Sequence, residues 1–259
     1  MNQALASIHP DAVIGKNVVI GPFVVIEKNV VIGDNTLIHS NAVIMEGARI
    51  GNNCQIFPGA VISAVPQDLK FNGEETTCEI GDNTTIRECV TVNRGTIAKG
   101  KTIVGKDCLL MAYAHVAHDC ILKNHVILGN ATQLAGEVEV DDYAILSGGT
   151  LVHQFSRIGK HVMIQGGSRL GKDIPPYITA GREPITYSGV NVVGLRRRGF
   201  TNEQISNIQE IYRILYQSGM NNKDAVKHID VNIPSSCEKE NVLSFVTSSQ
   251  RGILRGYLE

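Results

Sequence analysis

The sequence predicts a mainly β protein, a parallel β-helix of six-residue repeats followed by a C-terminal α-helical domain. Two observations lead to this fold class. An isoleucine recurs at every sixth position over the first quarter of the chain, and a helical pattern replaces this period after about residue 200. The uninterrupted run contains Ile8, Ile14, Ile20, Ile26, Ile32, Ile38, Ile44, Ile50, Ile56 and Ile62.

A period of six fits neither an α-helix nor one long strand, because it requires a short strand and a corner in every repeat. Three such repeats make a triangular coil of eighteen residues, and stacked coils pair as parallel strands about 4.8 Å apart. The same phase returns at Ile80 and continues in steps of six from Val104 to Leu170. Small or β-branched residues follow four positions later and also face inward. Cys54, Cys108 and Cys120 occupy such positions, so we expect buried thiols and no disulfide.

Two interruptions of the period predict external loops. Continuing the phase would bury Asp68 and Glu74, and the burial of unpaired carboxylates is prohibitive. Residues 66–79 are therefore expected to form a loop outside the prism. Ala98 continues the phase in a stretch rich in lysine and glycine, which predicts a second loop over residues 94–102.

The C-terminal region carries helix signals. A capping box begins at Thr201, apolar residues follow at helical spacing, and Ser218 and Gly219 end the segment. Shorter helices are expected over residues 222–230 and 238–249. We therefore predict two domains, a β-helix over residues 1–187 and a helical domain over residues 188–259.

Composition excludes several function classes. The formal net charge is −1, from 24 basic and 25 acidic residues, so nothing global indicates nucleic acid or an anionic membrane surface as a partner. No apolar run approaches the ~20 residues of a membrane span, and the N-terminus lacks the pattern of a signal peptide. These observations predict a cytoplasmic protein.

Two histidines indicate chemistry on the outside of the prism. His115 and His118 flank the inward residue Val116, and Asp119 follows directly. Stepping by eighteen from His118 places Gly136 on the next coil and Gln154 on the one after, with His153 adjoining. A histidine with a neighbouring carboxylate and a nearby glycine amide suits a general base beside an oxyanion donor, which favours acyl transfer. A zinc site is the alternative for the histidines.

Several motifs are specific enough to suggest a family. They are PQDLKFNGE (66–74), IRECVTVNRGT (86–96), HVAHDC (115–120), VHQF (152–155), IPPY (174–177) and GVNVVGLRRRGF (189–200). With these motifs the chain resembles the UDP-N-acetylglucosamine O-acyltransferases of lipid A biosynthesis, which are hexapeptide-repeat acyltransferases. The resemblance implies a left-handed β-helix and a homotrimer with active sites between subunits. It also implies transfer of a 3-hydroxyacyl chain from acyl carrier protein to the sugar 3-hydroxyl, with neither metal nor organic cofactor.

The resemblance also assigns roles to individual residues. It implies that His118 is the general base, Asp119 its orienting partner and Gly136 the oxyanion donor. His115 matches a supporting histidine, and Asp68 and Lys70 match loop residues that hold the sugar and its phosphates. The residues that match the nucleotide site are His153, Gln154, Asn191, Arg197 and Arg198. The chain departs from many family members at Glu137, where they have histidine, and at Val193, where they have glutamate.

A column of small residues predicts the acyl groove. Steps of eighteen connect Ala112, Asn130, Gly148 and Gly166 along one corner of the prism. The resemblance implies that Gly148 and Gly166 line the acyl cleft, and Met163 is assigned to the same groove. Because Gly166 leaves the groove open, we expect a long 3-hydroxyacyl chain, of about fourteen carbons or more at about four methylenes per coil step.

Three other functions remain open on the sequence alone. The related N-acyltransferases of the same pathway usually carry an extra N-terminal domain, whereas here the repeat begins at Ile8. A carbonic-anhydrase-like trimer would use His115, His118 and a further histidine as zinc ligands, and would contain stoichiometric zinc. A structural solenoid that only binds carrier protein would show no acyl transfer to a UDP-sugar.

Overall fold

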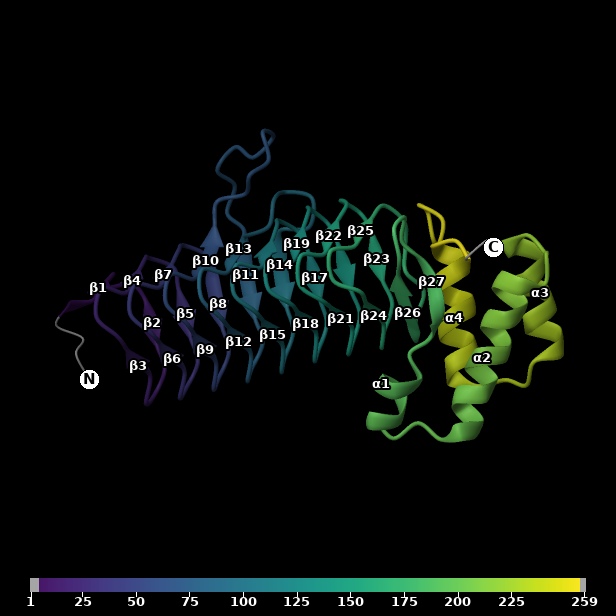
Figure 1. The fold of residues 1–259 in the computed structure, drawn as a ribbon. Coiled ribbons are helices and arrows are strands. Elements are labelled where there is room, and N and C mark those ends of the chain that lie inside the picture. Colours follow the sequence, from purple (N-terminus) through teal and green to yellow (C-terminus); the bar gives the residue numbers. More distant parts are fainter. Residues whose placement is uncertain (1–4, 257–259) are drawn as a thin grey trace.

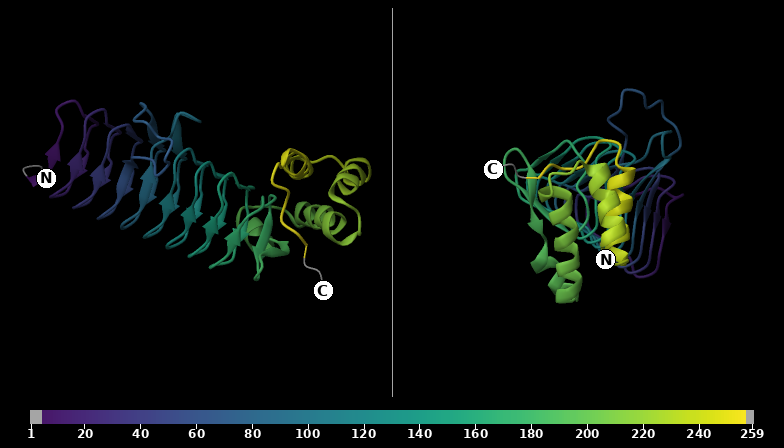
Figure 2. Two further views of the ribbon diagram at one scale, coloured as in Figure 1. Left: turned by 90° about the horizontal axis from the view of Figure 1, so that it is seen from above. Right: turned by 90° about the vertical axis from the view of Figure 1, so that its right-hand side faces the viewer.

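The computed structural model describes residues 5–256. The β-strands of this part of the chain form a long triangular prism of stacked coils, and its four helices gather at the C-terminal end of the prism (Figures 1 and 2). Three parallel sheets, which we call A, B and C, make the three sides. Strand numbers rise by three along most of each sheet, so each regular coil contributes one strand to every side.

The strands follow one another around the prism in the order A, B, C. Sheet A contains β1 (Ser7–Ile8), β4 (Val25–Ile26), β7 (Val43–Ile44), β10 (Val61–Ala64), β13 (Thr91–Asn93), β16 (His115–Val116), β19 (Gln133–Leu134), β22 (Leu151–Val152) and β25 (Arg169–Leu170). Sheet B contains β2 (Val13–Ile14), β5 (Val31–Ile32), β8 (Ala48–Ile50), β11 (Thr77–Ile80), β14 (Lys101–Val104), β17 (Ile121–Leu122), β20 (Glu139–Val140) and β23 (Arg157–Ile158). Sheet C contains β3 (Val19–Ile20), β6 (Leu37–Ile38), β9 (Gln55–Ile56), β12 (Thr85–Ile86), β15 (Leu109–Leu110), β18 (Ile127–Leu128), β21 (Ile145–Leu146), β24 (Met163–Ile164), β26 (Ile178–Gly181) and the antiparallel β27 (Thr186–Val190).

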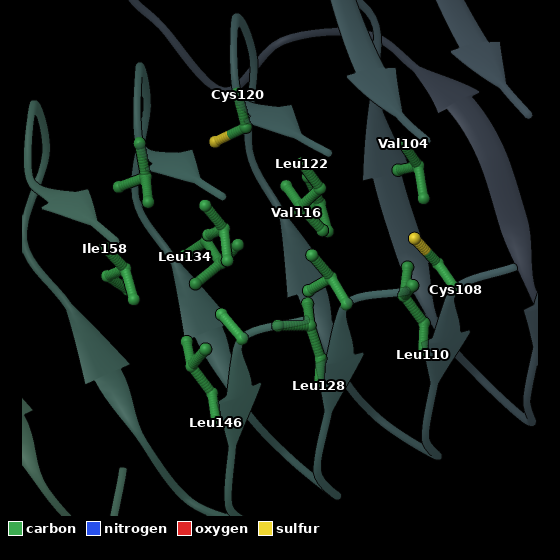
Figure 3. Packing of buried hydrophobic residues seen from close by; sticks show 14 of the residues in the cluster. Val104, Cys108, Leu110, Val116, Cys120, Leu122, Leu128, Leu134, Leu146 and Ile158 are labelled. Carbon is green, nitrogen blue, oxygen red and sulfur yellow. The ribbon is translucent and has the colours of Figure 1, made fainter. Parts of the chain in front are cut away.

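The inward side chains fill the prism as the six-residue period predicts. Every periodic isoleucine from Ile20 to Ile62 is at most 3% exposed. Figure 3 shows the same packing in the later coils, where leucines and valines meet on the prism axis. Cys108 and Cys120 point into this core as free thiols, and burial raises the pKa of Cys120 to about 12. These thiols are packing residues.

The two interruptions are loops, with ends that differ slightly from the predicted ones. Residues 65–76 connect β10 to β11, and residues 94–100 connect β13 to β14. The predicted loop over 66–79 was too long because Cys78 and Ile80 already face inward and β11 pairs with β8 and β14. The predicted loop over 94–102 was too long for the same reason, since β14 begins at Lys101.

Three helices lie where the sequence predicts them, and a fourth, shorter helix in the described part of the chain was not predicted. The capping box at Thr201 and Gln204 starts α2 (Asn202–Gln217). The other helices are α1 (Val192–Arg197), which was not predicted, α3 (Asn222–Asn232) and α4 (Cys237–Ser248). Helix α2 is anchored to the prism, because the buried hydroxyl of Tyr212 donates to the carbonyl of Pro176 at 2.6 Å. None of the helices within residues 5–256 is long and apolar enough to cross a membrane.

Aromatic rings stack along the corner between sheets B and C. The rings of His125, Tyr143 and His161 follow one another at centroid distances of 4.4 and 4.9 Å, and Tyr177 continues the stack. His161 is 8% exposed, and its Nδ1 has no hydrogen-bond partner in the described part of the chain. Burial, and then the positive charge of Arg198, lower the pKa of His161 to about 4.

The buried His161 predicts a loss of stability in mild acid. The folded state keeps this imidazole neutral, whereas the unfolded chain protonates it below about pH 6.5. The part of the free energy of unfolding that depends on a neutral His161 is therefore fully present above about pH 6.5. It is lost as the pH falls toward 4, by up to about 3 kcal/mol. His161→Phe keeps the ring stack and removes the titration. Thermal unfolding at about pH 7 and pH 4.5 should show a smaller loss in the variant; equal losses would contradict this assignment.

Candidate active site

The carboxylate of Asp119 lies buried at the corner that follows β16. Asp119 is 0% exposed and adopts a left-handed backbone conformation with φ of 60°. Its Oδ1 accepts the backbone N–H groups of Thr96, at 2.9 Å, and Lys99, at 3.2 Å. Its Oδ2 accepts the Thr96 hydroxyl at 2.6 Å and the His118 ring at 2.8 Å. A buried charge with this many donors is stabilised, so Asp119 is a fixed anionic partner for the imidazole.

His118 is oriented by this carboxylate. Its Nδ1 lies 2.8 Å from Oδ2 of Asp119, and its side chain is 18% exposed. In a neutral ring, Nδ1 donates to the carboxylate, so the proton-free Nε2 is the atom left to accept a proton. Because the side chain is partly exposed at a corner rather than in the core, a substrate can reach it.

Gly136 lies against the ring of His118. A Cβ at position 136 would be only 2.6 Å from both Cε1 and Nε2 of His118, so a larger residue would displace the imidazole. The Gly136 carbonyl accepts the N–H of Phe155 at 3.2 Å. Its own N–H has no acceptor within residues 5–256, whereas the equivalent amide of Lys16, at another corner, donates to Asp34. Gly136 therefore offers an unused donor next to the His118 imidazole.

A cavity of about 460 Å³, which we call the catalytic pocket, opens over His118 and Gly136. The loop over residues 65–76 forms one wall of it. Its lining residues are Gln67, Asp68, Leu69, Lys70, His118, Gly136, Glu137, Gln154 and Phe155. The predicted site residues Asp68, Lys70 and Gln154 thus meet His118 and Gly136 in one chain, and Glu137 brings a carboxylate to the same pocket.

The two loops are held together beside this pocket. Oε1 of Glu74 accepts the N–H of Ile97 at 3.2 Å, and Oε2 accepts the N–H of Asn72 at 2.7 Å. The guanidinium of Arg94 also lies over the ring of Phe71, 5.4 Å from its centroid. The loop that presents Asp68 and Lys70 is therefore connected to the loop that holds Asp119.

The structure places His115 and His153 in a different cavity. This sheet A groove of about 520 Å³ is lined by His115, Ala117, Gln133, Leu134, Ala135, Leu151, Val152, His153, Arg169, Leu170 and Gly171. The Nδ1 of His115 lies 2.7 Å from the Thr91 hydroxyl, and burial, with a smaller contribution from His118, lowers the pKa of His115. The groove runs along the side of the prism, whereas His118 stands at the corner beyond β16.

Asn191, Arg197 and Arg198 line neither of these two cavities. Asn191 is the N-cap of α1, because its side chain accepts the N–H of Gly194 at 3.1 Å and donates to the carbonyl of His161 at 2.9 Å. Arg198 lies over the ring of Tyr143, 5.0 Å from the centroid, and burial lowers its pKa. Arg197 is exposed. One chain alone does not bring this group to the catalytic pocket.

The predicted acyl-groove residues lie at the corner between sheets C and A. Gly148 and Gly166 are exposed there, and Met163 lies outward on β24 in sheet C. They are thus separated from His118 by the width of sheet A. A Cβ at position 166 would lie 3.1 Å from the carbonyl oxygen of Gly148, which is a tight contact, and at least 3.7 Å from its other neighbours.

Thr96 and Lys99, which hold Asp119, were not predicted from the sequence. Much of the lining of both cavities was not predicted either. The only sequence signal near Thr96 is the break in the period, because the loop shifts this segment out of the eighteen-residue register. Among the described residues, no group of three or more His, Cys, Asp or Glu side chains is placed to hold a metal ion.

A parallel β-helix with a carboxylate-oriented histidine beside a free glycine amide defines a hexapeptide-repeat acyltransferase. A family model described as UDP-N-acetylglucosamine O-acyltransferase, domain 2, matches residues 173–254, and a model of the GMPPB C-terminal domain matches residues 3–106. The acyl-[acyl-carrier-protein]–UDP-N-acetylglucosamine O-acyltransferase of Chlorobaculum parvum is 58% identical, over 96% of this chain and 97% of that protein.

Solved structures with a similar fold come from the same family as these relatives. The UDP-N-acetylglucosamine acyltransferase of Bacteroides fragilis is 60% identical, with a TM-score of 0.97 over 98% of this chain and 100% of that one. The corresponding Acinetobacter baumannii structure is 39% identical, with a TM-score of 0.95 over 97% and 98% of the two chains. The chain belongs to the UDP-N-acetylglucosamine O-acyltransferase family. The predicted left-handed β-helix with a C-terminal helical part is thereby confirmed.

Proposed function

We propose that this chain transfers a 3-hydroxyacyl group from acyl carrier protein to the 3-hydroxyl of UDP-N-acetylglucosamine, the first step of lipid A biosynthesis. The observation that carries this proposal is the His118–Asp119 pair, joined at 2.8 Å, with the His118 ring lying against Gly136. The names of the relatives support it, because they give an acyl group on acyl carrier protein as the donor and UDP-N-acetylglucosamine as the acceptor.

The geometry supports a direct transfer with His118 as the base. Nε2 of His118 takes the proton of the sugar 3-hydroxyl while that oxygen attacks the thioester carbonyl. Asp119 stabilises the imidazolium that forms, and the Gly136 N–H donates to the oxyanion of the tetrahedral intermediate. When the intermediate collapses, the carbon–sulfur bond breaks and the carrier thiolate takes the proton from His118. The products are a sugar ester and the free thiol, and the neutral base is restored.

The substrate contacts follow from where the charged groups lie. Asp68, Lys70 and Gln154 line the catalytic pocket, and we propose that they hold the sugar and its phosphates. Arg197 and Arg198 suit diphosphate oxygens, because a guanidinium donates in a planar fork. Since α1 does not reach this pocket in one chain, we propose that a neighbouring subunit of a homotrimer supplies Asn191 and both arginines. His115 and His153 would then support the substrates from the sheet A groove.

For the acyl chain we propose a groove along the corner of Gly148 and Gly166, with Met163 beside it.

Gly166→Met should fill about one coil step of this groove, which spans about four methylenes of the acyl chain. Losing about four buried methylenes costs ~3 kcal/mol, or about a hundredfold in kcat/KM for a long donor. Competition among carrier proteins of graded acyl length should show a preference shifted downward by about four carbons. Ser40→Met, at the same corner of an early coil, is the matched control. An unchanged profile in folded Gly166→Met would exclude this groove.

The proposed function is tested by identifying the product. Purified protein, 3-hydroxyacyl carrier protein and UDP-N-acetylglucosamine should give an ester that mild alkali cleaves. An analogue with an amino group at sugar position 3 would instead give a stable amide, and a strong preference for it would favour the N-acyl alternative. Absence of transfer to either acceptor would overturn the proposal. The predicted cytoplasmic location stays a prediction.

A further inference from the structure

The loop over residues 94–100 builds a socket for the Asp119 carboxylate. Thr96 is 5% exposed and contacts both carboxylate oxygens, through its N–H at 2.9 Å and its hydroxyl at 2.6 Å. The same hydroxyl accepts the N–H of Ala98 at 3.2 Å. A hydroxyl that accepts on one side directs its single proton to the other, so Thr96 donates to Asp119 rather than the reverse.

The oxygen that receives this hydroxyl is the one that orients the base. Oδ2 of Asp119 accepts both the Thr96 hydroxyl and Nδ1 of His118. Charge-assisted hydrogen bonds are short and directional, and a buried carboxylate that loses one relaxes toward other donors. Thr96 therefore fixes the position of the atom to which the imidazole is bonded.

Hydrogen bonds fix the loop at several points, three of which involve Thr96 and its two neighbours in the chain. The Gly100 N–H donates to the Thr96 carbonyl at 2.7 Å, and the Thr76 hydroxyl donates to the Gly95 carbonyl at 2.6 Å. The third point is the bond between Ile97 and Glu74, which belongs to the loop that carries Asp68 and Lys70. Thr96 thus stands on a rigid segment, as a residue that sets the geometry of another must.

We propose that Thr96 is a positioning residue that holds Asp119, and through it His118, in the geometry required for proton transfer. The proposal rests on the proposed function of the His118–Asp119 pair. Thr96 lines neither the catalytic pocket nor the sheet A groove, so its loss acts on the rate of the chemical step and not on substrate binding.

The test compares Thr96→Val with Thr96→Ser. Valine keeps the shape and removes the hydroxyl, so kcat should fall by on the order of 10- to 100-fold with KM for both substrates unchanged. Serine keeps the donor and should restore most of the rate. Thr84→Val is the matched control. Thr84 is also a fully buried threonine with two hydrogen bonds, to the Gly105 carbonyl and the Cys108 N–H, but it lies at another corner.

Two outcomes would overturn the proposal. One is a Thr96→Val enzyme as fast as Thr84→Val, and the other is a serine variant as slow as the valine variant. If valine unfolds the protein, Thr96→Ala takes its place and is compared with Thr96 both in the wild-type protein and in the Asp119→Ala background, where any rate difference due to positioning must vanish. A loss of the same size in both backgrounds would overturn the proposal. The parent mechanism is tested separately by His118→Ala. A slow His118→Ala beside a normal Thr96→Val rejects the positioning role alone, whereas a fast His118→Ala rejects the base itself.

Discussion

His118→Ala is expected to lower kcat by about 10²- to 10⁴-fold, the usual contribution of a general base. The fold should be unaffected, because the side chain stands at a corner outside the packed prism and, within residues 5–256, its only hydrogen bond is to Asp119. The measurement is steady-state transfer of the acyl group, together with thermal unfolding of the same preparation. Substrate binding should change little, since the imidazole acts mainly in the transition state.

His9→Ala is the control for this change. His9 lies on the first coil, partly exposed and far along the prism from the catalytic pocket. It should keep wild-type kinetics. A His118→Ala enzyme that retains more than about a tenth of the wild-type kcat would remove this residue from the mechanism, because a base is required to contribute at least ~10²-fold.

Gly136→Ala is expected to reduce kcat by on the order of a hundredfold, because a displacement of about 1 Å at a reacting group costs that much. The added methyl would lie 2.6 Å from the His118 ring, and the ring is the part free to move. The backbone N–H remains in alanine, so the variant isolates the steric effect. Thermal stability should change little, since the crowded atoms belong to one side chain at the pocket wall.

A double variant separates displacement of the base from other effects. If Gly136→Ala acts by moving His118, adding it to His118→Ala should cost little further rate, because the two changes share one cause. A full additional loss in the double variant would show that position 136 acts independently of the imidazole. A wild-type kcat for Gly136→Ala alone would show that the close approach of residue 136 to the His118 ring does not affect catalysis.

The prism could be predicted because its cause is local and repeated. One aliphatic position in six decides which side chain faces the core, and Ile20 and Ile62 obey this rule equally. The same arithmetic placed Gly136 over His118, since the coils between Val116 and Val152 contain no insertion. The capping box at Thr201 likewise needs only neighbouring residues.

The rest of the site depends on contacts that no period encodes. Thr96 reaches Asp119 from an inserted loop whose path breaks the register. His115 and His118 are three residues apart, yet the strand side and the corner direct them to two cavities. Helix α1 was missed because its N-cap, Asn191, is stabilised partly by the carbonyl of His161, thirty residues earlier.

Chemical rescue shows whether His118 removes the proton of the acceptor hydroxyl. Single-turnover transfer by His118→Ala is measured with and without added imidazole, because the space vacated in the catalytic pocket can admit a small soluble base. We expect almost no transfer by the variant alone and a rate that rises with the concentration of neutral imidazole, with no such rise for Gly136→Ala, which still carries its own ring. A variant that binds both substrates normally but transfers at the same rate with and without imidazole would contradict this role of His118.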